Sequence, residues 1–225
     1  MELPFYLPFS FLLTALLSIW LLFKAVEYKR IVVFIVLTWT ILQLVLGYLG
    51  FFEEAVSKMY RLPLLAGPPV LLIFIVLLLP SNASWLYSIN QEKLTRIHIV
   101  RFLVELILYG LFLQSAIPEV MTFAGRNFDI LAGLTAPIVI FMAYRKEIFK
   151  RKALLIWNLF SLLLLLNIVV TAVLAIPTPF QVFGFDQPNL AVLHFPFNLL
   201  PAVVVPIVLF AHIACIRQLW RSQNS

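Results

Sequence analysis

The chain has 225 residues, of which 63% are hydrophobic and 12% are charged. A soluble domain carries about 45–50% apolar and about 25% charged residues, so this composition excludes an ordinary soluble domain and indicates an integral membrane protein. The net charge is +6, and the single cysteine, Cys215, excludes an internal disulfide.

Seven apolar stretches follow one another along the chain with short loops between them. A membrane-spanning helix needs about 20 mostly apolar residues, and lipid offers no hydrogen-bond partner to the backbone of any other single-segment structure. The sequence therefore predicts an all-α integral membrane protein that forms one transmembrane domain over residues 1–225. The predicted spans are Leu3–Phe23, Ile31–Phe52, Leu62–Leu79, Ile97–Ile117, Ile130–Tyr144, Ala153–Ile176 and Val192–Ile216.

The basic residues alternate between the loops on the two sides of the predicted membrane. Three lie on one side, namely Lys58, Arg61 and Arg126. Twelve lie on the other, namely Lys24, Lys29, Arg30, Lys93, Arg96, Arg145, Lys146, Lys150, Arg151, Lys152, Arg217 and Arg221. Cytoplasmic loops carry the excess of Lys and Arg, so the N-terminus is predicted outside and the C-terminus inside.

This orientation accounts for the positive charge without a nucleic-acid partner and favours contact with anionic membrane lipid. The compact loops are typical of a protein of the bacterial inner membrane.

Residues 12–30 align without a gap on residues 133–151. The identical pairs are Leu13/Leu134, Thr14/Thr135, Ala15/Ala136, Ile19/Ile140, Lys29/Lys150 and Arg30/Arg151. The alignment favours two parallel three-helix units, residues 1–80 and 128–216, joined by a connector helix over residues 97–117. This arrangement is similar to that of SWEET-type sugar transporters, although their proline-glutamine signature is absent. A chance alignment of leucine-rich spans is the alternative.

The fourth predicted span carries ionisable residues, which are costly in a membrane and therefore suggest a function. His98, Arg101 and Glu105 share one helix face, and His212 in the last span is expected at a similar depth. The simplest interpretation is a structural ion pair between Arg101 and Glu105. A second is a proton or ion path through Glu105, and a third is a metal or haem site on the two histidines. The sequence does not identify a cofactor.

The opposite side of the predicted membrane has polar residues of its own. The loop before the fifth span carries four that we expect at an outer mouth: Glu119, Arg126, Asn127 and Asp129. Asn127 or Asp129 is also the predicted N-cap of the fifth span. Four further polar residues, Gln43, Asn167, His194 and Asn198, are predicted contacts for a solute. Prolines 63, 68 and 69 in the third span and 196, 201 and 206 in the seventh interrupt matching helices, as in many transporters.

Two functions are predicted, with a third left open. The first is a transporter for a small molecule or ion, with Gln43, Asn167, His194 and Asn198 as contacts and Glu105 as the coupling group. The second is a membrane-embedded enzyme for a lipid or isoprenoid-like substrate, with His98, Arg101, Glu105 and His212 as its catalytic residues. The third is an accessory membrane subunit that has no site of its own.

Overall fold

The computed structural model describes residues 3–79, 82–149 and 151–221, so the predicted basic residue Lys150 lies outside the described residues. Within the described residues all regular structure is helical. The α-helices are α1 (Tyr6–Ala25), α2 (Arg30–Tyr48), α3 (Pro63–Leu78), α4 (Ala83–Ser88), α5 (Gln91–Ile97), α6 (Val100–Leu113), α7 (Ile130–Ile140), α8 (Arg151–Leu174) and α9 (Val205–Arg221). Two π-helical segments extend them: η5 (Phe141–Arg145) after α7, and η7 (Leu200–Val204) before α9.

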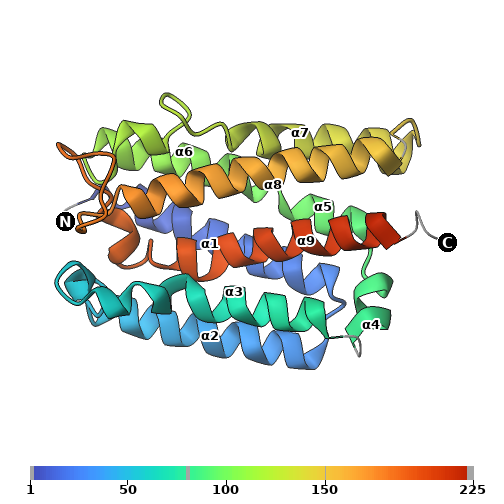
Figure 1. Cartoon of the computed structure of the whole chain (residues 1–225), viewed down its shortest axis with the longest axis horizontal. Helices are drawn as coiled ribbons and strands as arrows, with labels where there is room; N and C mark the ends of the chain where they lie inside the picture. The colour runs from blue at the N-terminus through green and yellow to red at the C-terminus, as the bar shows by residue number, and fades with distance from the viewer. Residues whose placement is uncertain (1–2, 80–81, 150, 222–225) are drawn as a thin grey trace.

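The long helices lie side by side along the length of the molecule (Figure 1). The N-terminus and the connections α2–α3, α6–α7 and α8–α9 are at one end, which we call the N-terminal end. The C-terminus and the connections α1–α2, α3–α5 and α7–α8 are at the other, the C-terminal end. The basic side predicted from the sequence therefore corresponds to the C-terminal end.

Five helical segments of the described residues are long and apolar enough to cross a membrane: Tyr6–Ala25, Arg30–Tyr48, Met59–Leu77, Arg151–Leu174 and Leu200–Trp220. Of the residues in the first segment 50% are buried inside the protein, and of those in the last segment 61% are buried. The second and third segments bury only 17% and 11% of their residues. Large apolar side chains such as Phe34 and Leu163 cover the outward faces of the peripheral helices. Lipid is the environment in which such a surface is stable, and the fold is that of an all-α membrane protein.

The predicted fourth span differs from the structure. In the structure the helical region begins earlier than predicted, at Gln91. It consists of two helices, α5 and α6, which are joined at His98 and Ile99. Hydrogen bonds of the 3₁₀ type carry the chain through this joint, from the His98 N–H to Thr95 O (3.2 Å) and from the Arg101 N–H to His98 O (3.1 Å). Both α1 and α7 pack against this pair of helices, so α5 and α6 lie between them.

The predicted start of the seventh span is also wrong, because the continuous helical segment begins at Leu200 rather than at Val192. Residues 192–199 form the end of the short helix η6 (Ala191–Leu193) and an irregular segment. Pro196 and Pro201 explain the late start, since a proline has no N–H to contribute to a preceding helical turn.

Candidate functional site

Arg101 is the centre of a buried polar cluster. Its Nε donates to Asp129 Oδ2 (2.7 Å), and its Nη2 donates to Asp129 Oδ1 and to the carbonyl of Ser161 (2.8 Å). The Arg101 and Asp129 side chains are only 2% and 6% exposed. The predicted ion pair between Arg101 and Glu105 is therefore wrong, because the first residues of α7 bring Asp129 into a two-point contact with the guanidinium group.

Glu105 bonds instead to the loop before α7. One of its oxygens, Oε1, accepts from Asn127 Nδ2 (2.5 Å), and the other, Oε2, has no partner within the described residues. Asn127 also donates to Met121 O and accepts the N–H of Asp129 (both 3.0 Å). Asp129 occupies the N-cap position of α7, but its side chain makes no cap bond because it binds Arg101.

These contacts leave a charge imbalance in the interior. Asp129 already neutralises Arg101, so an ionised Glu105 has no counter-charge of its own among the described residues. An uncompensated charge in a low-dielectric interior costs several kcal/mol. A proton or a cationic group at Glu105 removes this cost.

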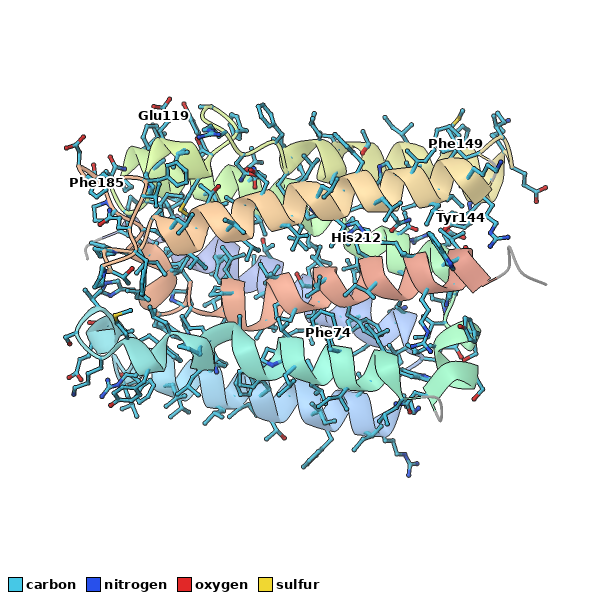
Figure 2. The ribbon with its side chains drawn as sticks, in the orientation of Figure 1. Phe74, Glu119, Tyr144, Phe149, Phe185 and His212 are labelled. Carbon is cyan, nitrogen blue, oxygen red and sulfur yellow. The ribbon has the colours of Figure 1, made fainter. Side chains whose placement is uncertain are left out.

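The two buried histidines are in contact. The rings of His98 and His212 stack with their centroids 3.9 Å apart, and His98 meets the edge of Trp157. His212 lies inside the bundle on α9, as Figure 2 shows. Its Nε2 is 2.9 Å from Arg101 Nη1, and its Nδ1 is 3.1 Å from Asn158 Oδ1. Arginine can only donate, so Nε2 accepts and Nδ1–H donates to Asn158.

This arrangement does not fit the predicted metal or haem site. Arg101 Nη1 is bonded to Nε2 of His212, so this nitrogen is not available to a metal ion. Within the ranges that the structure covers, no group of three or more His, Cys, Asp or Glu side chains is placed to hold a metal ion.

A cavity of about 170 Å³ lies beside the Arg101 cluster, between α3, α6, α8 and the segment η7–α9. Its polar lining residues are Arg101, Glu105, Asp129 and Asn189, and the rest of its wall is apolar. Asn189 donates to Ala172 O (3.0 Å), while its Oδ1 has no partner among the described residues. Neither His98 nor His212 lines the cavity, so a solute inside it meets Glu105 but not the histidines.

Gln43 and Asn198, two predicted solute contacts, do not line this cavity. Pro68 leaves the carbonyl of Leu64 without its helical partner, and Gln43 Nε2 donates to that oxygen (3.2 Å). Asn198 Nδ2 donates to Gln43 O (2.8 Å) and lies against Gly47. These amides therefore connect α2 to α3 and to the segment before α9.

The other predicted contacts also lie outside the cavity. Asn167 is exposed and donates to the carbonyl of Arg126 (3.1 Å), and His194 Nδ1 is 3.0 Å from Glu53 Oε1 at the N-terminal end.

The four residues of the predicted outer mouth divide into two pairs. Glu119 and Arg126 are exposed, whereas Asn127 and Asp129 are buried within the cluster around Arg101.

Sequence reasoning missed Asn189 and the role of Asp129. A buried arginine requires a counter-charge, and Asp129 directly precedes the next predicted helix, so the pair could have been considered. Asn189 lies in a loop and carries no spacing signal, because its place beside the cavity depends on the fold of residues 175–190.

Residues 60–220 match the model of a protein family described as a domain of unknown function, DUF8737. The chain belongs to this family. The matched region runs from just before α3 to α9 and includes Arg101, Glu105, Asp129 and the whole lining of the cavity. No curated protein and no solved structure matches the chain.

Proposed function

We propose that the protein crosses the membrane seven times, with its N-terminus outside. The five membrane-length helices, α7 with η5, and α5 with α6 supply the seven crossings. From Gln91 to Leu113, α5 and α6 cover about 34 Å at 1.5 Å per residue, enough for a hydrocarbon core of about 30 Å. The excess of basic residues at the C-terminal end supports a cytoplasmic location for that end, and a bacterial inner membrane is the membrane that we propose.

We further propose that the protein is a carrier for a small solute, and that Glu105 is the group that binds it. The observation that carries this proposal is Glu105, which lines an apolar cavity and whose buried Oε2 has no partner among the described residues. Ionisable groups inside membrane proteins are costly and often mark a substrate path or a proton path. The cavity also lies where the first three-helix unit, through α3, meets the second, through α8 and α9.

The polar atoms of the cavity define the chemistry of the solute. Two lining residues, Glu105 and Asn189, each carry a buried atom without a partner among the described residues, and both atoms, Glu105 Oε2 and Asn189 Oδ1, are hydrogen-bond acceptors. A matching solute has a hydrogen-bond donor at one end, and a cationic donor also neutralises Glu105. The remaining wall is apolar, and about 170 Å³ is below the size of a typical drug-binding pocket, so the rest of the solute is small and apolar.

Glu105 gives this carrier a simple coupling scheme. A proton neutralises the carboxylate when the cavity is empty, and a cationic solute replaces the proton when it binds. Each binding event then releases one proton, and transport exchanges the solute for a proton across the membrane. The two units, residues 1–80 and 128–216, would move relative to each other around the cavity, as repeats do in many transporters.

The alternative of a lipid-modifying enzyme has less support. The contact between His98 and His212 brings its proposed catalytic residues together. A general acid or base must reach the substrate directly or through one water; of the four proposed catalytic residues, Arg101 and Glu105 line the cavity and the two histidines do not.

A binding experiment tests the carrier proposal. The probes are butylguanidinium, which has several N–H donors, and butyltrimethylammonium, which has the same charge and number of non-hydrogen atoms but no donor. Calorimetric titration of the protein in lipid nanodiscs should show binding of butylguanidinium alone. Glu105→Gln should abolish it, whereas Glu119→Gln, at an exposed carboxylate, should not. Equal binding by the two probes, or undiminished binding to Glu105→Gln, would contradict the proposal.

A further inference from the structure

A second cavity, of about 220 Å³, lies on the other side of α3, between α1, α2, α3 and α9. Its wall is almost entirely apolar, and Thr40 is its one lining residue with a side-chain hydroxyl. It shares no lining residue with the cavity at Glu105. This cavity therefore needs an explanation of its own.

The packing of α2 explains why the space exists. The buried residues of α2 are Thr40, Gln43 and Gly47, all in the half nearer the N-terminal end. There Gln43 is held by its bond to Leu64 O and Trp39 by its bond to Ala202 O (2.9 Å). From Arg30 to Val36 no residue is fully buried, and Val32, Val33 and Val36 are only partly buried against the core, so this half of α2 packs less closely than the other half.

The dimensions of the cavity match one leaflet of a bilayer. On α2 its lining runs from Val32 to Thr40, a rise of about 12 Å at 1.5 Å per residue. Half of a hydrocarbon core of about 30 Å is roughly 15 Å. The cavity thus extends from the C-terminal end of the bundle to about its middle, as one acyl chain of a lipid in that leaflet does.

Positive charge lies at the C-terminal end of this cavity. Lys29 Nζ is 4.1 Å from the ring centroid of Trp85, which lines the cavity and stacks on Phe210 (6.4 Å). Arg30 begins α2 and is exposed. In the described part of the chain neither Lys29 nor Arg30 forms an ion pair, whereas the neighbouring Glu27 is paired with Lys93 (3.1 Å).

We propose that this cavity binds an anionic phospholipid of the leaflet at the C-terminal end. One acyl chain fills the space between α2 and α3, and the phosphate contacts Lys29 and Arg30. Basic sites between transmembrane helices on the cytoplasmic side bind anionic headgroups in this way. The bound chain adds packing to the first half of α2, where the side chains are only partly buried. The site is separate from Glu105, and it does not depend on the carrier function.

Tryptophan quenching by brominated lipids tests this proposal. Trp39 and Trp85 line the cavity, while Trp20, Trp157 and Trp220 lie outside it. The protein with Trp20→Phe, Trp157→Phe and Trp220→Phe is reconstituted with dibrominated phosphatidylglycerol or dibrominated phosphatidylcholine at equal mole fraction. We expect stronger quenching by the anionic lipid, with a preference on the order of tenfold in binding.

Charge variants identify the headgroup site. Lys29→Gln with Arg30→Gln should remove the preference for the anionic lipid, and Lys146→Gln with Lys152→Gln, at the same end of the molecule, should leave it intact. Equal quenching by the two lipids would overturn the proposal, and so would a preference that survives loss of Lys29 and Arg30 or one that both pairs of substitutions remove.

A second measurement uses the unsubstituted chain. In delipidated protein in detergent, phosphatidylglycerol should raise the unfolding temperature more than phosphatidylcholine does. Equal shifts would contradict a specific anionic site.

Discussion

Asp129, at the start of α7, forms the ion pair with Arg101, although Glu105 lies one helical turn from Arg101 on the same helix. The consequence is a division of roles between two acidic residues. Asp129 neutralises the arginine and fixes α7 against α6, while Glu105, which lines the cavity, keeps one oxygen without a partner among the described residues.

This division predicts the effect of removing Asp129. Asp129→Asn leaves the buried Arg101 without its counter-charge, and breaking a buried pair costs about 3–5 kcal/mol. Combining it with Arg101→Gln should restore much of the lost stability, since no unpaired charge remains. Thermal unfolding in detergent measures both effects, with the exposed Asp186→Asn as a control. A double variant as unstable as the sum of the two single variants would contradict the ion-pair assignment.

The bond from Trp39 to Ala202 depends on Pro206. A proline at 206 cannot donate to the carbonyl of Ala202, and the indole N–H of Trp39 takes that place (2.9 Å). Trp39→Phe should cost about 1–3 kcal/mol by leaving a buried carbonyl unpaired. In a Pro206→Ala background the amide N–H at 206 is available, so the same substitution should cost less. If unfolding shows equal costs in both backgrounds, the indole does not replace a proline-freed bond.

Two glycines in neighbouring helices should respond in opposite directions to alanine. A Cβ on Gly47 would lie 2.5 Å from Asn198 Oδ1, whereas a Cβ on Gly67 meets nothing within 4 Å. Gly47→Ala should destabilise the protein by about 1–3 kcal/mol through overpacking. Gly67→Ala should stabilise α3 by about 0.5–1 kcal/mol because it restricts the unfolded chain. Unfolding temperatures that fall for both or rise for both would conflict with this packing.

The sequence predicts the architecture better than it predicts the contacts. Composition alone indicates an all-helical membrane protein, because only helices satisfy the backbone of long apolar segments. The sequence does not reveal that Asp129, rather than Glu105, forms the ion pair with Arg101, because this pairing depends on how the loop before α7 folds. In the same way, Gln43 and Asn198 look like solute contacts in the sequence. Their partners, Leu64 O and Gln43 O, become visible only when α2, α3 and α9 are placed together.

Cysteine labelling tests the proposed orientation. Cys215 is buried and can be replaced by alanine to give a chain without cysteine. Ser57, before α3, and Ser88, at the end of α4, are both exposed, and they follow opposite ends of the α2–α3 helix pair: Ser57 lies in the α2–α3 connection and Ser88 in the α3–α5 connection. A membrane-impermeant maleimide added to intact cells should label Ser57→Cys, and Ser88→Cys only after lysis. The reverse pattern would mean that the N-terminus is inside.

Proton movement in proteoliposomes that contain a pH-sensitive dye tests the proposed exchange at Glu105 most directly. An inward gradient of butylguanidinium, which stays charged like arginine and cannot cross lipid as a neutral amine, should drive protons out and raise the internal pH. Glu105→Gln should show no such change, and butyltrimethylammonium should cause none in the unsubstituted protein. No change with butylguanidinium, or the same change in Glu105→Gln, would contradict a carrier that exchanges its solute for a proton at Glu105.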